Sequence, residues 1–227
     1  MSIFGISDLH LPLGADKPMD IFRGWDDYVE RIENNWCKMI TDYDYVVIPG
    51  DISWALKLSE TYNDFKFIDK LPGKKIILKG NHDLWWSTMN KMNTFLEENN
   101  FNSISFIHNS CYEIGEYAIC GSRGWFFDDN STASKKVILR EATRLDVSIK
   151  TAKELNKTPL VFLHYPVCFN NQVCEELFEV LQKHEIKDVW HGHIHGSGKQ
   201  YITSEYMGIC FHLISCDCIN FSPILIK

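Results

Sequence analysis

The sequence predicts a layered α/β fold, and two observations carry that prediction. Short apolar runs rich in Ile, Val and Phe alternate with stretches whose apolar residues recur at helical spacing. Several of the apolar runs are followed closely by Asp, Asn or His, as happens when neighbouring strands deliver polar side chains to one edge of a sheet. Such alternation is typical of sheets covered by helices. The chain has 227 residues and lacks internal repeats, so we expect one domain over 1–227.

Each predicted strand is a short apolar run that ends at polar or turn residues. In chain order these runs span 2–7, 45–48, 75–79, 159–163 and 188–191. Residues 26–40 and 138–152 carry apolar side chains at helical spacing and are predicted as helices. The segments 104–121 and 199–225 are predicted as short strands joined by turns, which indicates a second, more antiparallel sheet.

Composition excludes several classes of function. A formal charge of −7 disfavours binding to nucleic acid, because that affinity comes from many Lys and Arg contacts to phosphates. No stretch is long and apolar enough to predict a membrane span, and the N-terminus has no basic segment followed by an apolar run. The eight cysteines are scattered without a Cys-x-x-Cys pair, as expected of reduced thiols. We therefore expect a cytoplasmic protein, and the excess of Lys over Arg favours a bacterial source.

Five short motifs follow the predicted strands and together indicate a metal site. In order they are Asp8-Leu9-His10, Gly50-Asp51, Gly80-Asn81-His82-Asp83, Leu163-His164 and Gly192-His193-Ile194-His195. Carboxylate, imidazole and amide ligands suit divalent first-row metals. Asp8 and His10 are two residues apart, so on an extended backbone their side chains would share a face and one metal could take both. The two oxygens of Asp51 allow it to bridge two ions.

This ordered set resembles the calcineurin-like metallophosphoesterase superfamily. The family pattern is Asp-x-His, Gly-Asp, Gly-Asn-His-Asp/Glu, a later His and Gly-His-x-His, and its elements occur here in order between residues 8 and 195. The resemblance implies a four-layer α/β/β/α sandwich of two mixed sheets flanked by helices. It also implies two divalent metals with Asp51 as the bridge. The first would be held by Asp8, His10, Asp51 and His195, and the second by Asp51, Asn81, His164 and His193.

The resemblance also implies a mechanism. A hydroxide shared by the two metals would attack the phosphorus of a phosphomonoester or phosphodiester. His82 would act as the general acid that protonates the leaving group, with Asp83 holding its imidazole in place. The ligand set admits Mn, Fe, Zn, Ni or Co, and we take Mn as the first to test.

Substrate contacts are less well marked, with Asn81 and Arg123 as the candidates. Arg123 lies in a glycine-flanked segment where its guanidinium could clamp a phosphate, or could instead form an ordinary ion pair. The Gly50-Asp51 motif continues without the arginine that protein Ser/Thr phosphatases of the superfamily carry there, so the chain more closely resembles the small bacterial phosphohydrolases. Residues 122–134 could form a flap over the site.

Several aromatic residues follow the motifs and leave two interpretations open. They are Trp54, Trp85, Trp86, Trp125, Phe126, Phe127 and Tyr165. They could line a pocket for a small, nucleotide-like phosphorylated substrate, or pack beneath the loops. Two alternatives to a small-molecule phosphoesterase also stay open, namely a nuclease with the same site and a non-catalytic scaffold. The acidic charge weighs against the nuclease, and the retention of His82 and of every expected ligand weighs against the scaffold.

Overall fold

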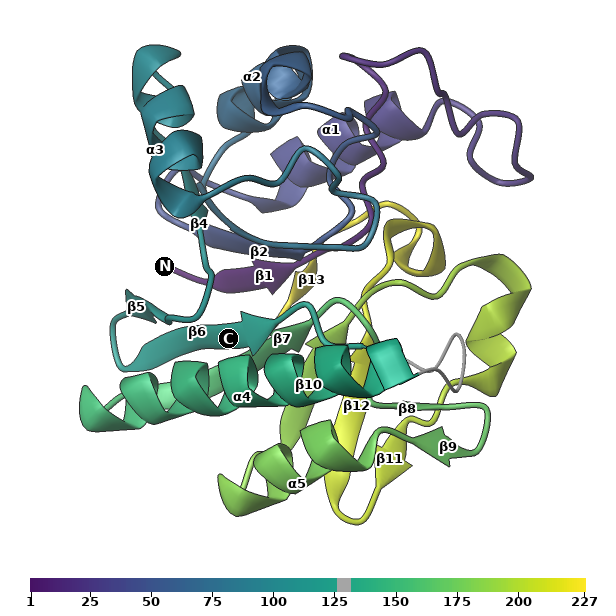
Figure 1. Cartoon of the computed structure of the whole chain (residues 1–227). Coiled ribbons are helices and arrows are strands. Elements are labelled where there is room, and N and C mark those ends of the chain that lie inside the picture. Colours follow the sequence, from purple (N-terminus) through teal and green to yellow (C-terminus); the bar gives the residue numbers. More distant parts are fainter. Residues whose placement is uncertain (126–131) are drawn as a thin grey trace.

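A computed structural model describes residues 1–125 and 132–227. Two mixed sheets lie face to face, and helices cover the outer face of each (Figure 1). The expected four-layer α/β/β/α sandwich is therefore confirmed. Part of the 122–134 segment considered as a flap, including Phe126 and Phe127, lies outside the described residues.

The first sheet is built mainly from the N-terminal half of the chain. Its order is β13-β1-β2-β3-β4, with β1 at Ile3–Gly5, β2 at Tyr45–Pro49, β3 at Lys74–Leu78, β4 at Ile104–Phe106 and β13 at Ile224–Leu225. All neighbours are parallel except β13, which pairs antiparallel with β1. Its outer face carries α1 (Tyr28–Met39), α2 (Tyr62–Lys70) and α3 (Met89–Glu98) (Figure 1).

The second sheet differs from its prediction. Its order is β11-β12-β10-β7-β6-β5, with β5 at Tyr112–Ile114, β6 at Tyr117–Ser122, β7 at Thr158–Leu163, β10 at Asp188–His191, β11 at Glu205–Tyr206 and β12 at Ile209–Leu213. The four inner strands are parallel, and antiparallel pairing among the described residues of this sheet occurs at the two edges. The expectation of a more antiparallel second sheet was wrong, because β6 and β12 pair parallel with β7 and β10. Strands β4 and β13, from the same two predicted segments, belong to the first sheet.

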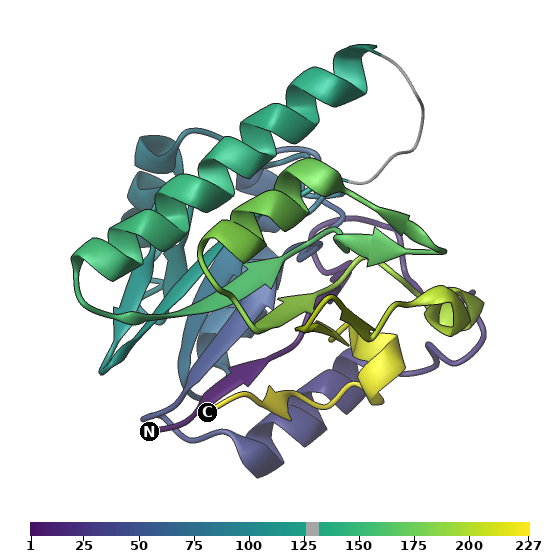
Figure 2. The same ribbon diagram turned by 90° about the horizontal axis from the view of Figure 1, so that it is seen from below.

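Two helices cover the second sheet, as Figure 2 shows from below. They are α4 (Thr132–Glu154) and α5 (Glu175–Lys183), and a small hairpin of β8 (Cys168–Phe169) and β9 (Gln172–Val173) precedes α5. Single 3-10 turns occur at Leu58–Thr61 (η1), Gly196–Tyr201 (η2) and Cys216–Ile219 (η3). Within the described residues, no helix combines the length and apolar character needed to span a bilayer.

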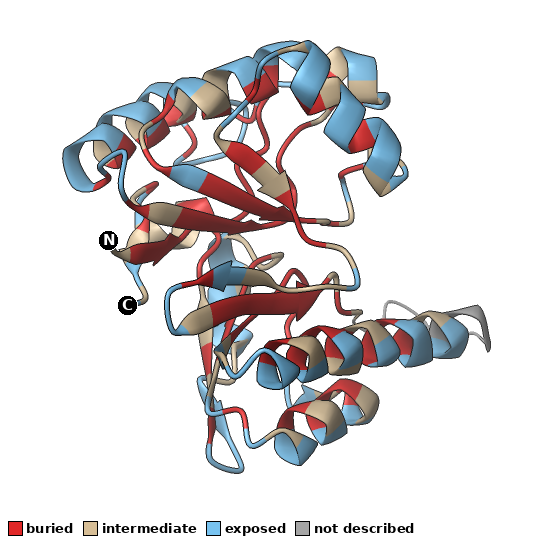
Figure 3. Ribbon diagram, turned by 90° about the vertical axis from the view of Figure 1, so that its left-hand side faces the viewer, coloured by how far each residue is buried: buried red, intermediate tan, exposed pale blue. Residues whose placement is uncertain are grey.

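The predicted helices form because their apolar spacing buries one face. On α1 the buried residues Tyr28, Ile32 and Trp36 are four apart, which places them on one side of the helix. Figure 3 shows the result across the molecule, with buried residues on the strands and on the inner helix faces. Between the sheets, the ring of Phe162 on β7 stacks on Trp190 of β10 with centroids 5.2 Å apart. This core fixes the two sheets so that their carboxyl ends share one edge.

Candidate metal centre

Seven polar side chains converge where strands from both sheets end. They are Asp8 after β1, Asp51 after β2, Asn81 after β3, His164 after β7 and His193 after β10, with His10 and His195 each two residues further on. All seven are the metal ligands expected from the sequence. Three of them come from the second sheet and four from the first, so the centre lies across the interface of the sandwich.

The backbone that presents these side chains is not extended, contrary to the sequence argument for Asp8 and His10. Both residues have left-handed φ angles, 60° and 46°, and so have Asp51 at 54° and His193 at 71°. Non-glycine residues rarely adopt this conformation, and where they do the surrounding structure must hold them in it. Here main-chain bonds do so, because the amides of Asp8 and His10 donate to the carbonyls of Gly50 and Asp51. Tight turns, rather than a shared strand face, bring the ligands together.

The first group of candidate ligands consists of Asp8, His10 and His195. One ligand atom from each lies within 4.8 Å of the others. His195 Nε2 is 3.4 Å from His10 Nε2 and 3.4 Å from Asp8 Oδ1. Two imidazole nitrogens and a carboxylate oxygen around one point form a suitable donor set for a divalent first-row cation.

The second group shares Asp8 and adds Asp51 and His164, again within 4.8 Å of one another. Asp51 Oδ2 is 3.5 Å from His164 Nε2 and 3.8 Å from His10 Nε2, so its carboxylate lies between the two groups. Asn81 Oδ1 is 2.6 Å from His164 Nε2 and 2.9 Å from His193 Nδ1. The position of Asp51 suits a bridging ligand.

The tautomer of His164 tests whether a cation fits this group. Its Nδ1 lies 3.0 Å from the carbonyl oxygen of Pro49, which can only accept, so Nδ1 carries the proton. Burial lowers the pKa of His164 to about 3, so the ring is neutral and Nε2 presents a lone pair. That lone pair faces the side-chain oxygen of Asn81, which is also an acceptor. A cation between them would satisfy both atoms.

The pKa shifts of the candidate carboxylate ligands also favour a bound cation. Burial alone would raise the pKa of Asp8, but the hydrogen bond and charge of His195 and the charges of His164 and His10 hold it well below its ordinary value. Burial and the nearby charges of Asp8 and Asp83 raise the pKa of Asp51. Two buried carboxylates this close need positive charge near them, which bound cations would supply.

Asp83 does not contact His82 in the way expected. Its buried carboxylate accepts hydrogen bonds from the main-chain amides of Asp51, Ile52 and Gly80 at 2.7–2.9 Å, and from Trp85 Nε1 at 3.0 Å. These bonds tie the β2 and β3 loops together beneath the centre. Asp83 therefore supports the loop that carries Asp51, and this arrangement replaces the expected role of orienting the His82 imidazole.

His82 lies at the mouth of the centre. Its main-chain amide donates to Asp51 Oδ1 at 2.8 Å, and its exposed ring is 4.6 Å from the ring of Trp54, centroid to centroid. The ring lines a cavity of about 290 Å3, together with Lys17 and apolar side chains that include Met19 and Phe22. This position is consistent with proton donation to a group that leaves into the cavity.

Asp217 was missed by the sequence analysis. Its Oδ1 lies 2.8 Å from His195 Nδ1, and its Oδ2 accepts from the Gly196 amide at 2.8 Å. Burial alone would lower the pKa of His195, but the bonds and charges of Asp217 and Asp8 outweigh it and raise that pKa to about 10. A carboxylate behind a ligating histidine fixes its ring and tautomer. No spacing rule links residues 195 and 217, so only the fold reveals the pair.

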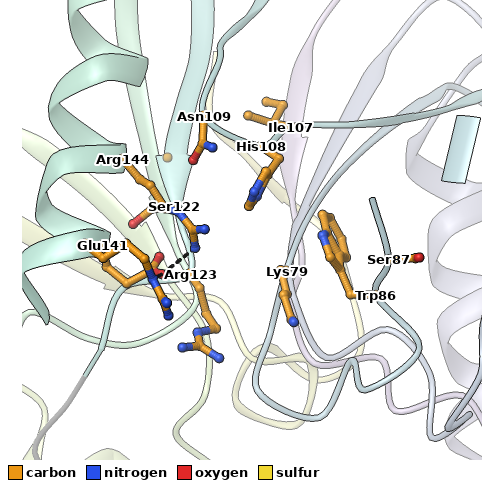
Figure 4. Close-up of a pocket in the computed structure, with 12 residues that line it drawn as sticks. Lys79, Trp86, Ser87, Ile107, His108, Asn109, Ser122, Arg123, Glu141 and Arg144 are labelled. Carbon is orange, nitrogen blue, oxygen red and sulfur yellow. Dashed lines mark hydrogen bonds and ion pairs between the residues drawn. The ribbon is translucent and has the colours of Figure 1, made fainter. Parts of the chain in front are cut away.

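Arg123 is next to the centre but does not join the ligand cluster. Its carbonyl oxygen accepts from the amides of His164 and Tyr165, at 3.2 and 3.0 Å, so its main chain supports a candidate ligand. Its guanidinium lies over the Trp125 ring at 4.7 Å and lines a different cavity (Figure 4). Of the other aromatic residues considered, Trp85 is buried, which agrees with packing beneath the loops.

Comparisons with known proteins bear on the fold and on the family. A protein of unknown function from Aquifex aeolicus superposes with a TM-score of 0.50 and 19% identity, covering 99% of this chain and 95% of that one. The phosphopantetheinyl hydrolase of Mycobacterium tuberculosis superposes with a TM-score of 0.50 and 16% identity, covering 94% and 88%. These likenesses show the fold, and no curated protein sequence matches the chain. The family model of the calcineurin-like phosphoesterases matches residues 1–197. The chain therefore belongs to the calcineurin-like phosphoesterase family.

Proposed function

We propose that this protein is a binuclear metal-dependent phosphoesterase that hydrolyses a small phosphorylated molecule. The observation that carries the proposal is the pair of overlapping ligand groups, Asp8–His10–His195 and Asp8–Asp51–His164, with Asp51 between them. Asn81 and His193 complete the donor set of the second group. The family gives the reaction class, and the cavity of about 290 Å3 gives room for a small leaving group.

In this proposal, individual residues of the chain have distinct chemical roles. Bound metals would activate water and neutralise the oxygens of the phosphoryl group. His82 is placed to give a proton to the leaving-group oxygen, because its exposed ring faces the cavity. Lys17, whose Nζ is 3.7 Å from the Trp54 ring centroid on the same wall, adds positive charge where a phosphate would enter.

The two alternative functions, a nuclease and a non-catalytic scaffold, receive less support. A nuclease would need a basic path for a polyanion, and the chain has a net charge of −7. A scaffold would not need ligand atoms within 4.8 Å of one another, nor an exposed histidine beside them.

The test is a metal-reconstituted assay with chelated protein and added Mn²⁺. We would compare p-nitrophenyl phosphate with bis-p-nitrophenyl phosphate and then repeat the series with Fe, Zn, Ni and Co. Asp51→Asn removes the carboxylate between the two ligand groups, whereas Asp188→Asn changes a half-buried carboxylate that pairs with His212. We expect metal-dependent hydrolysis that Asp51→Asn abolishes and Asp188→Asn preserves. Failure of the wild-type protein to bind metal would overturn the proposal.

A further inference from the structure

A second cavity lies beside the metal centre along the same sheet edge. It has a volume of about 270 Å3, and its walls come from the ends of β3 and β6, the loop after β4 and one face of α4 (Figure 4). The candidate metal ligands follow β1, β2 and β3 in one sheet and β7 and β10 in the other. Since β4 neighbours β3 and β6 neighbours β7, the cavity is the next position along the edge. One to two strand spacings put it roughly 5–10 Å from the centre.

The lining of this cavity is strongly basic. Among the described residues that line it, Lys79, Arg123, Arg140 and Arg144 are cationic and Glu141 is the one acidic residue. This excess of positive charge contrasts with the net charge of −7 for the whole chain. Figure 4 shows Lys79 and His108 on one side of the gap facing Arg123 and Arg144 on the other.

Glu141 neutralises only part of this charge. The residue is fully buried, and its Oε1 lies 2.7 Å from Arg144 Nη1 and 3.7 Å from Arg140 Nε. One carboxylate can balance one guanidinium, so it orients the two arginines and leaves a net positive charge. Preset guanidinium forks match the oxygens of a phosphate.

The Arg123 guanidinium has a buried donor that no protein atom accepts from in the described structure. Its Nε is buried and has no hydrogen-bond partner within the described structure. Buried donors are normally paired, so this one, at a cavity wall, is available to a ligand atom that can accept from it. The guanidinium is held over the Trp125 ring, which fixes its plane while leaving its donors free.

The positive charges that line the cavity also act on the pKa of His108. Burial and the charges of Arg144, Lys79 and Arg140 all lower it, so the imidazole is kept neutral. A neutral ring avoids further repulsion within the cluster. An anion would relieve the repulsion that the cations exert on one another.

We propose that this cavity binds a second phosphate group of the substrate, so that the enzyme acts on small molecules carrying two phosphates roughly 5–10 Å apart. The inference rests on the proposed phosphoesterase function, because the metal centre takes the phosphate that is cleaved. Three guanidinium groups and one ammonium favour a dianionic phosphate over a single carboxylate. The main-chain bonds that the His164 and Tyr165 amides donate to the Arg123 carbonyl oxygen connect the wall of this cavity directly to the centre.

The first experiment is kinetic. A graded series of α,ω-alkanediol bisphosphates is compared with the matching monophosphates in the Mn²⁺-loaded wild-type protein and in Arg140→Gln. Lys150→Gln is the control, because it removes the same charge from the same helix at an exposed ion pair with Glu154. We expect one spacer length at which KM for the bisphosphate is about tenfold or more below that of the monophosphate. Arg140→Gln should bring the ratio toward one, whereas Lys150→Gln should keep it.

The second experiment separates this inference from the function on which it rests. Chelated, metal-free protein is titrated with inorganic phosphate, followed by calorimetry. Saturable binding that Arg140→Gln weakens, and that Lys150→Gln and Asp51→Asn retain, supports the cavity even if no ester is hydrolysed. Hydrolysis with equal KM values for both substrate classes, and no phosphate binding by metal-free protein, would overturn the cavity while leaving the phosphoesterase proposal intact.

Discussion

His195 Nδ1 lies 2.8 Å from Asp217 Oδ1, and this contact joins a candidate metal ligand to a residue 22 positions away in the chain. The opposite ring nitrogen of His195 faces Asp8 and His10. Asp217 thereby fixes both the plane of the ring and the nitrogen that is left free for a metal.

We expect Asp217→Asn to lower metal affinity by about 10–100-fold without unfolding the protein, as is typical when the partner of a ligating histidine is lost. Equilibrium dialysis against Mn²⁺ measures this. Asp188→Asn is the matched control, since Asp188 Oδ1 is 2.7 Å from His212 Nε2 at a half-buried site away from the candidate ligands. Equal affinities for the two variants would show that Asp217 does not position His195.

His82→Ala should keep the metals and lower kcat by about 10²–10⁴ for an alkyl phosphate, because the leaving alkoxide needs a proton. The loss should be much smaller for p-nitrophenyl phosphate, whose phenolate leaves without one. Parallel kinetics on the two substrates check this, with Mn²⁺ content measured on the same samples. Equal losses on both substrates would exclude a proton-donating role.

Asp83→Asn should behave differently from His82→Ala. The change weakens or unpairs some of the four donors that now reach the carboxylate, and each unpaired buried donor costs about 1–3 kcal/mol. We expect a lower free energy of unfolding together with reduced metal binding. Urea denaturation measures the first, with Glu154→Gln, at an exposed ion pair with Lys150, as the control. Unchanged stability with a selective loss of kcat would instead favour a role for Asp83 in orienting the His82 imidazole.

Gly192→Ala should disrupt the centre by displacing the Asp8 side chain. A Cβ at this position would collide with Asp8 Oδ2 and Ser7 Oγ, so the Asp8 carboxylate would have to move. We expect loss of metal binding and of hydrolysis. Gly198→Ala is the control, because its Cβ would meet only the Cγ2 methyl of Ile194, at 3.0 Å, and none of the candidate ligands. Metal binding by Gly192→Ala at the wild-type level would contradict this geometry.

Asp64 should make stability depend on pH. Burial outweighs the hydrogen bonds from Ser53 and Leu13 and raises its pKa from 3.8 to about 6. The folded state therefore holds the proton more tightly than the unfolded state, so this contribution is complete below pH 3.8 and is lost as the pH rises through 6. Between these limits the wild-type protein should lose up to about 3 kcal/mol relative to Asp64→Asn. Urea denaturation of chelated protein across this range measures the difference, and parallel curves would contradict it.

The sequence was most informative where local chemistry decides the structure. The five strands predicted from apolar runs all form, because β-branched runs bounded by turns have few alternatives in a buried sheet. The helix predicted at 26–40 is observed at Tyr28–Met39, since its buried residues follow a strict helical period. The motif order identified the candidate ligands because each follows a strand end.

What the sequence could not supply is long-range pairing. Strand β13 joins β1 across more than 200 residues, and no local pattern assigns it to the first sheet. The left-handed backbone at Asp8 and His10 depends on main-chain bonds to the segment after β2, and the Asp83 carboxylate accepts from the Asp51 and Ile52 amides of that same segment. Asp217 meets His195 because β10 and β12, the strands that precede them, are neighbours in the second sheet. Each miss involves a partner that only the three-dimensional fold brings into contact.

The separation of Asp8 from His193, His195 and Asp217 along the chain also sets the order in which the centre can form. More than 200 residues lie between Asp8 and Asp217, so a ribosome makes the first carboxylate long before the last supporting one. Contacts that span so much of a chain form slowly, because the intervening loop must close before they stabilise anything. The nascent chain therefore has no complete centre until the segment with Asp217 has been made, and a product truncated before His193 would carry the motifs of the first sheet without a complete ligand set.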